Sequence, residues 1–426
     1  MIKLKRALGL FTVTLYGVGI ILGAGIYALI GEAANTAGNS LWMSFLIAAT
    51  LASLTGLSYC ELSSMYPKAA AEYVYTKKAF GSNLISFMLG WLIIFTGMVS
   101  AAAVALGFAG YFHGLFNTPI VLMAVLLILV LSFLNFYGIK ESARFNIAFT
   151  IIEALGLILI IFIGLGSWGK VNYLDAPLGA SGVFSAAALI FFAYIGFEDI
   201  VNVAEETKRP RKILPRAIVL AIIITTLLYV SVSVSAVSVT SWQELGQSKA
   251  PLALVASKVF GDQAFFLLSV IALFATTNTV LIILIVGTRM IYGMADNGSL
   301  PRVLASIHEK RRTPWVAVII FMIFSILFAL IGEIAVVAKA TSLGTILVFA
   351  FVNASLIKLR FSKHTSKRTF KVPLNIGKFP VLPFLGLLVC IFLMFYFSLD
   401  AMLIVLAIIL TGYFIFYMMK KFQKIK

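Results

Sequence analysis

The chain has 426 residues, of which 62% are hydrophobic and 12% are charged. Soluble domains carry about 25% charged residues, and one soluble core cannot hide so much apolar surface. The composition excludes a soluble globular protein and predicts an all-α integral membrane protein.

Twelve apolar segments are expected to cross the bilayer as helices, since one crossing takes about 20 mostly apolar residues. They lie near residues 8–34, 40–66, 83–113, 118–138, 142–168, 182–205, 215–240, 262–294, 314–332, 335–357, 380–398 and 400–420. An even number of spans places both termini on the same side of the membrane.

The net charge of +17 is distributed unevenly between the two sides. With the N-terminus inside, the outer side receives only four of the 33 Lys and Arg residues: Lys170, Lys249, Lys258 and Lys339. This asymmetry follows the positive-inside rule, so we expect a multi-pass plasma-membrane protein with both termini in the cytoplasm. The basic charge therefore reflects topology and contact with anionic membrane lipids, and a nucleic-acid partner is not expected.

No stretch predicts a soluble domain, so residues 1–426 are expected to form a single transmembrane domain. The first five spans, about 8–168, and the next five, about 182–357, form blocks of similar length. An odd number of spans per block gives the two blocks opposite orientations, which is the arrangement of a five-plus-five inverted repeat. The last two helices, about 380–420, are additional.

The first span contains Gly17, Gly19, Gly23 and Gly25 in the run GVGIILGAGIY. Each glycine costs about 1 kcal/mol relative to alanine inside a helix, so this span is easy to unwind. Lipid does not tolerate unwound backbone, but a ligand-filled cavity does, and the freed amides would attract a carboxylate. The alternative is close helix packing through the GxxxG pair of Gly19 and Gly23. The first span alone leaves both interpretations open.

The sixth span reads FFAYIGFEDIVNVAEETKRPRK and places Glu198 and Asp199 beside Gly196. Burying one acid at the bilayer centre costs about 2.5–3.5 kcal/mol on insertion scales, so the pair indicates unwinding, protonation or a polar cavity. The alternative is a shifted helix with both acids at the inner headgroups. The distance along the chain to Lys208 makes that alternative weaker. Breaks in corresponding spans of two halves are typical of a transporter site.

Four segments together resemble the amino acid–polyamine–organocation (APC) superfamily of transporters: GVGIILGAGIY (17–27), YCELSSMYPKAAAEYVYTKKAFG (59–81), FFAYIGFEDIVNVAEETKRPRKILPRAI (191–218) and RMIYGMADNGSLP (289–301). The resemblance covers about residues 5–360. It implies the LeuT-like five-plus-five inverted repeat with two extra helices, and secondary active transport of amino acids by alternating access, usually coupled to protons. Exchange of amines, polyamines or cationic amino acids is the alternative.

The resemblance also implies which residues bind the substrate. Backbone amides would hold its carboxylate, at Gly23, Ala24 and Gly25. Backbone carbonyls would hold its ammonium group, at Ile21, Phe192 and Ile195. Aromatic side chains would line or gate the pocket: Phe192, Tyr194 and Phe197. This lining fits neutral amino acids better than acidic ones.

Two acids are candidates for coupling. Glu198 matches the family's acidic position after the glycine of the sixth span, where it would sense protons. Glu153 stands where relatives commonly carry a lysine that substitutes for a sodium ion, so the lysine mechanism does not transfer. Glu153 could itself carry the proton, or hold a cation with the hydroxyls of Thr276 and Thr277; a structural glutamate bonded to the first span is the alternative.

Other functional classes lack their signatures. The three histidines, His113, His308 and His364, lie in loops or at segment ends, which leaves none for an intramembrane Ser-His dyad, a zinc site or a haem ligand. A channel would need rings of charge or a carbonyl filter, and neither is visible. We therefore expect no enzyme, cofactor or metal site, and the expected partners are a small amino acid, a proton or sodium ion, and lipid.

Overall fold

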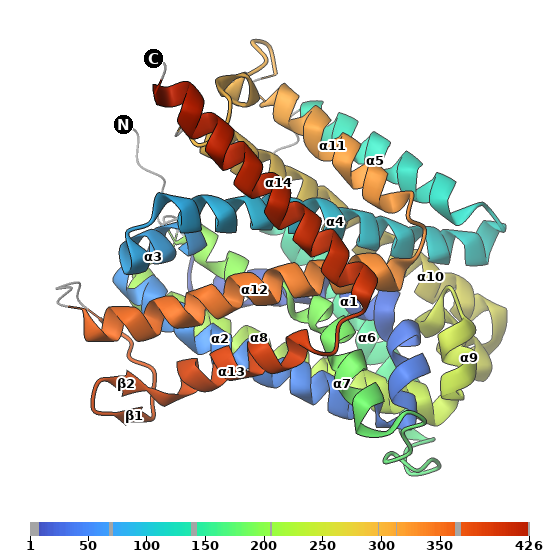
Figure 1. The fold of residues 1–426 in the computed structure, drawn as a ribbon. Coiled ribbons are helices and arrows are strands. Elements are labelled where there is room, and N and C mark those ends of the chain that lie inside the picture. The colour runs from blue at the N-terminus through green and yellow to red at the C-terminus, as the bar shows by residue number, and fades with distance from the viewer. Residues whose placement is uncertain are drawn as a thin grey trace.

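The computed structural model describes residues 8–67, 71–137, 143–204, 207–296, 298–311, 313–362 and 368–424. Long helices dominate this part of the chain (Figure 1). In order, the α-helices are α1 (Leu10–Ala37), α2 (Leu41–Met65), α3 (Ala71–Phe80), α4 (Asn83–Phe116), α5 (Ile120–Tyr137), α6 (Ala143–Leu165), α7 (Gly179–Ile190), α8 (Pro210–Val239), α9 (Trp242–Gln247), α10 (Pro251–Asp296), α11 (Trp315–Ala329), α12 (Ile334–Phe361), α13 (Val381–Met394) and α14 (Leu399–Lys424).

Short elements connect these helices. The 3-10 helices are η1 (Gly38–Ser40), η2 (Phe191–Tyr194), η3 (Phe197–Val203) and η4 (Arg302–Ala305). The strands β1 (Asn375–Ile376) and β2 (Phe379–Pro380) form a small antiparallel hairpin.

Each of the twelve predicted apolar segments coincides with a helical segment, which confirms an all-helical membrane architecture. Eight stretches within the described ranges are long and apolar enough to cross a bilayer. Four further apolar helices are shorter: Leu10–Gly23, Phe149–Leu165, Trp315–Ala329 and Val381–Met394. The protein is therefore a multi-pass membrane protein.

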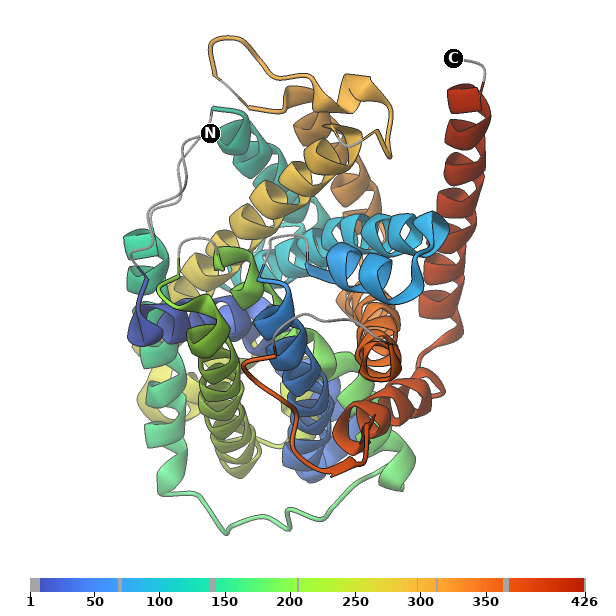
Figure 2. The same cartoon turned by 90° about the vertical axis from the view of Figure 1, so that its left-hand side faces the viewer.

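Helix α1 lies at the centre of the bundle. It packs against α6, α7, α8, α9 and α10 and against both short helices of the sixth span. Helix α4 packs against both α10 and α12, and α2 packs along α8. Helix α14 crosses the front of the bundle in Figure 1 and stands at its edge in Figure 2, and it contacts α4 and α12. Large apolar side chains are exposed along α14, such as Leu403, Leu410 and Phe414, as expected of a lipid-facing helix.

The two ends of the bundle differ in their elements. Figure 1 shows α3 and the β1–β2 hairpin at one end and α9 at the other. The predicted cytoplasmic connectors thus gather at one end and the predicted outer connectors at the other.

Local chemistry explains several helix boundaries. The Ser82 hydroxyl accepts a hydrogen bond from the amide of Ile85 (3.3 Å) and so caps the start of α4. Asn117, with φ 51°, ends that helix in a left-handed conformation that asparagine tolerates. Within α10, Gly261 has φ 70° and divides the helix in two, next to where the sequence predicts the span 262–294 to begin.

Candidate functional site

The first span is broken at the glycine run. Gly23 has φ −8° and ψ −156°, so α1 is two helices that meet at this residue. A Cβ at Gly23 would lie 2.7 Å from the Thr279 hydroxyl oxygen of α10. A Cβ at Gly25 would lie 2.5 Å from the Cα of Ala193 in the sixth span. The break therefore exists, and glycine is required there because neighbouring helices approach the backbone closely.

The sixth span is broken at the corresponding place. Helix α7 gives way to η2, Ile195 is extended with ψ 135°, and Gly196 has φ 120°, which L-residues rarely adopt. Helix η3 then begins at Phe197. The Glu198 carboxylate accepts a hydrogen bond from the Gly196 amide (2.9 Å), so this acid satisfies backbone that the break exposes.

A tyrosine of α8 joins the two breaks. The Tyr229 hydroxyl lies 2.6 Å from the carbonyl oxygen of Ile21 and 3.0 Å from that of Ala193. The hydroxyl has one proton, which it donates to one of these two carbonyls at a time or shares between them. Tyr229 was not predicted from the sequence. The only local hint of its role is that a tyrosine hydroxyl within an apolar span needs a hydrogen-bond partner. The carbonyl of Ile21, expected to bind the substrate ammonium, is thus held by a protein hydroxyl in this conformation.

The predicted aromatic residues occupy different positions around the breaks. Phe192 keeps 7% of its surface exposed, whereas Tyr194 and Phe197 are fully buried. The Tyr194 hydroxyl donates to the Phe45 carbonyl (3.2 Å) of α2. Phe197 packs against the ring of Phe349, with centroids 5.2 Å apart. Tyr194 and Phe197 therefore tie the sixth span to α2 and α12, and Phe192 is the most exposed of the three.

Glu153 of α6 is a buried acid whose carboxylate is not compensated. Its surface is 1% exposed, and neither carboxylate oxygen has a hydrogen-bond partner among the described residues. Asn278 of α10 interacts with the carboxylate but does not reach hydrogen-bond geometry. The Tyr27 hydroxyl of α1 donates instead to the Glu153 backbone carbonyl (2.7 Å). A buried carboxylate without a bonded partner costs free energy, and uptake of a proton or a cation would remove that cost.

The predicted threonines of α10, Thr276 and Thr277, make no hydrogen bond to the Glu153 carboxylate among the described residues. The Thr276 hydroxyl donates to the carbonyl of Ala272 (2.7 Å) within its own helix, and Thr277 is half-buried. The structure instead brings Asn278 to Glu153 and Thr279 to Gly23. The sequence indicated the correct turn of α10, but not which of its residues face α1 and α6.

A further acid, Glu72 of α3, lies between the sixth-span break and the predicted cytoplasmic end. The Tyr59 hydroxyl donates to the Glu72 carboxylate of α3 (2.8 Å). Burial raises the pKa of Glu72, and the bond from Tyr59 opposes that shift in part. Glu198 and Glu72 both interact electrostatically with Tyr59, so polar groups connect the break to the α3 end.

Known proteins are similar in sequence to this chain along nearly its whole length. A family model described as amino acid permease matches residues 8–420. The branched-chain amino acid permease BcaP of Bacillus subtilis (strain 168) is 33% identical over 417 residues, which cover 92% of this chain and 88% of that protein. The methylthioribose transporter of the same organism is 29% identical over 418 residues, covering 92% of this chain and 88% of that protein.

A mammalian relative is also similar. Cationic amino acid transporter 4 of Mus musculus is 29% identical over 388 residues, covering 85% of this chain and 61% of that protein. These relatives are transporters and not enzymes. The motifs, the helical membrane architecture and these matches agree: the chain belongs to the amino acid permease family of the APC superfamily.

Proposed function

We propose that this protein is a secondary active transporter that carries neutral amino acids across the plasma membrane by alternating access. The observation that carries the proposal is the meeting of two broken spans at the centre of the bundle, where Gly25 contacts Ala193. Broken spans at mid-membrane present backbone amides and carbonyls, which complement the carboxylate and ammonium groups of an amino acid. The amides at Gly23, Ala24 and Gly25 take the carboxylate in this proposal.

The architecture in this proposal is twelve membrane crossings within one domain. The first and sixth of the twelve helical segments are the broken ones, which supports repeats of about 8–168 and 182–357 in inverted orientation. Both termini then lie in the cytoplasm, together with α3 and the basic connectors.

A neutral, apolar side chain is the proposed substrate feature. The residues around the breaks are predominantly apolar or aromatic, including Ile21, Phe192 and Ile195. A relative with 33% identity is named for branched-chain amino acids. A screen of thermal stability against the twenty amino acids and common polyamines tests this, because a ligand that binds the folded state raises its stability by about 2.7 kcal/mol at 100 times its Kd. Stabilisation by leucine, isoleucine or valine is expected, and stabilisation by cationic amino acids or amines alone would favour exchange of cationic substrates instead.

Glu153 is the proposed carrier of the coupling ion, because its buried carboxylate has no compensating bond among the described residues. A proton is the proposed ion. Glu153→Gln is expected to reduce accumulation driven by a pH gradient to simple equilibration while leaving amino-acid exchange intact, since the amide matches the carboxyl in shape but binds no proton. Uptake into proteoliposomes, with a pH gradient or a sodium gradient, measures this. Loss of sodium-driven accumulation instead identifies sodium as the ion, and unchanged accumulation in both gradients removes Glu153 from the mechanism.

Glu198→Gln provides the comparison for the second acid. The glutamine carbonyl can still accept from the Gly196 amide, so the break should retain its shape. In this proposal Glu198 senses protons, and the variant should exchange amino acids at a rate that no longer depends on pH. An exchange rate with the same pH dependence as that of the unmodified protein would contradict this role.

Tyr229→Phe is expected to lower both stability and transport. The substitution removes the hydroxyl that joins Ile21 and Ala193 and leaves buried carbonyls unpaired, at a cost of about 1–3 kcal/mol. Thermal unfolding in detergent and leucine uptake measure the effect. Tyr413→Phe, at a tyrosine 53% exposed on α14, is the matched control. Equal effects of the two substitutions would show that the bridge has no energetic importance.

A further inference from the structure

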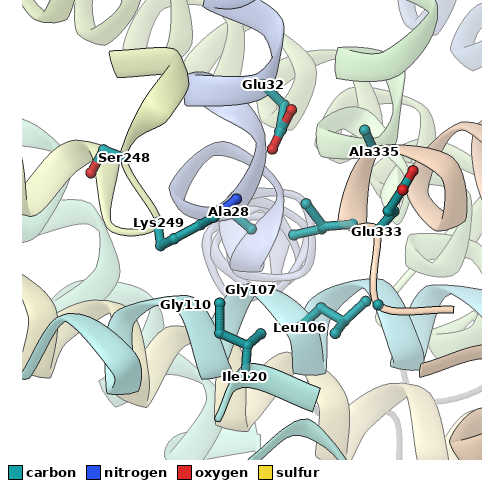
Figure 3. A pocket seen from close by; sticks show the side chains of 12 residues that line it. Ala28, Glu32, Leu106, Gly107, Gly110, Ile120, Ser248, Lys249, Glu333 and Ala335 are labelled. Carbon is teal, nitrogen blue, oxygen red and sulfur yellow. The ribbon is translucent and has the colours of Figure 1, made fainter. Parts of the chain in front are cut away.

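A cavity of about 240 Å³ lies near α9, at the end of the bundle predicted to face outward (Figure 3). It is lined by the outer half of α1, by α4, by the start of α12 and by the segment before α10. Pockets for drug-sized ligands measure about 300–1,000 Å³, so this outer cavity suits one small molecule the size of an amino acid.

Opposite charges flank the outer cavity. Lys249, from the segment before α10, and Glu32, from α1, direct their charged ends into it from different sides, and Glu333 stands at a third side (Figure 3). Among the described residues, no ion pair within 4.0 Å joins any of these three groups. Lys339 is the further charged group nearby, and it interacts electrostatically with Glu32. A cation and an anion held apart across a cavity are complementary to a zwitterion.

Close backbone packing fixes the position of Lys249, the cation at the outer cavity. A Cβ at Gly110 of α4 would lie 2.5 Å from the carbonyl oxygen of Lys249, so α4 supports the Lys249 backbone directly. The Ser248 hydroxyl accepts from the amide of Ala250 (3.1 Å) and shapes the same turn. The lysine therefore projects from a tightly held segment and not from a free loop.

The outer cavity lies close to the α1 break. Ala28 lines the cavity and lies three residues beyond Gly25, which is about one helical turn. A Cβ at Gly107 would lie 2.5 Å from the Cβ of Ala28, so α1 and α4 touch here without intervening side chains. Ala28 lies five residues beyond Gly23, so the floor of the outer cavity is about 7.5 Å along α1 from the break.

We propose that the outer cavity is a second, outer binding site for a zwitterionic amino acid, occupied before the substrate reaches the breaks. The Lys249 ammonium pairs with the substrate carboxylate and the Glu32 carboxylate pairs with its ammonium group. The apolar side chains of Leu106 and Ile120 face the substrate's hydrocarbon part. This inference rests on the proposed transport function and adds to it the residues that first capture the substrate.

Uptake kinetics of Lys249→Met and Glu32→Gln in proteoliposomes test the outer site. Each variant is expected to raise the KM for leucine about tenfold, the effect of losing one charge-assisted bond, with the maximal rate within about twofold of the unmodified protein. The controls are Lys258→Met and Glu244→Gln, which break an exposed ion pair (2.9 Å) at the same end of the bundle. Neither control should change KM.

Inhibition by two leucine analogues identifies which charge each residue binds. The amine 3-methylbutylamine lacks the carboxylate, so its inhibition should survive Lys249→Met and weaken in Glu32→Gln. The acid 4-methylpentanoate should show the opposite pattern. Stabilisation by saturating leucine, measured by thermal unfolding, should persist in both variants and show that the central site is folded.

Each result separates the outer site from the proposed function. Absence of saturable amino-acid uptake by the unmodified protein would overturn the proposed function and the outer site with it. Normal uptake by the unmodified protein, with unchanged KM in Lys249→Met and Glu32→Gln, would overturn the outer site alone. A lowered maximal rate at unchanged KM would also overturn it, because the two residues would then act in conformational change and not in binding.

Discussion

Replacing Glu61 by alanine is expected to destabilise the protein by about 3–5 kcal/mol, the cost of leaving a buried charge without its partner. Glu61 lies on α2 and is fully buried. Its carboxylate accepts from Arg360 of α12 (2.5 Å) and from the amide of Val372 (2.8 Å), and it lies 3.3 Å from the Arg368 guanidinium. The substitution would strand Arg360, whose side chain is 2% exposed.

Thermal unfolding in detergent measures this effect, with two comparisons. Glu244→Ala removes an acid from an exposed ion pair and should cost less than about 1 kcal/mol. The double variant Glu61→Ala with Arg360→Met should be more stable than Glu61→Ala alone, because it removes the stranded charge as well. If Glu61→Ala costs no more than Glu244→Ala, the buried network does not hold α2 to α12.

Gly25→Val is expected to reduce amino-acid transport by about 100-fold or more, the scale of a displacement of about 1 Å at a reacting or binding centre. The new Cβ would meet the Cα of Ala193 at 2.5 Å, and backbone on the opposing side cannot move away as a flexible side chain can. The two breaks must then separate, and the groups proposed to bind the substrate separate with them.

Uptake into proteoliposomes measures the loss, beside thermal unfolding to establish that the variant is folded. Gly166→Val is the matched control, because no atom lies within 4 Å of a Cβ at that position and its backbone is not left-handed. Transport by folded Gly25→Val at the rate of Gly166→Val would show that contact between the breaks is not needed.

Features local in the sequence were predictable. Hydropathy located all twelve apolar segments, and the glycine run of the first span together with the acids beside Gly196 in the sixth marked the two spans that break. Composition sufficed here because glycine in a span and acids at mid-membrane each carry a large energetic cost. Glu153 was identified through the resemblance, at a position where relatives commonly carry a lysine, and the structure places it in the interior.

Features that depend on distant contacts were not predictable. Tyr229 and Ile21 are 208 residues apart in the chain, and Arg360 and Glu61 are 299 apart. No local sequence pattern predicts a hydrogen bond between residues so far apart in the chain. Thr276 and Thr277 were the predicted residues of α10, and Asn278 and Thr279 were missed for a different reason: α10 is apolar on all sides, so its sequence does not reveal which face turns toward α1.

Counterflow in proteoliposomes tests the central claim most directly, that one alternating site between two broken helices carries an amino acid. Vesicles loaded with unlabelled leucine and diluted into a trace of labelled leucine should accumulate label transiently above equilibrium. Label enters in exchange for unlabelled leucine, and the excess unlabelled leucine inside competes with the label for the inward-facing site and slows its exit. Gly166→Val should give the same overshoot and Gly25→Val should give none. Label that enters without overshoot, in proportion to its concentration and regardless of internal leucine, would contradict the account and indicate a channel.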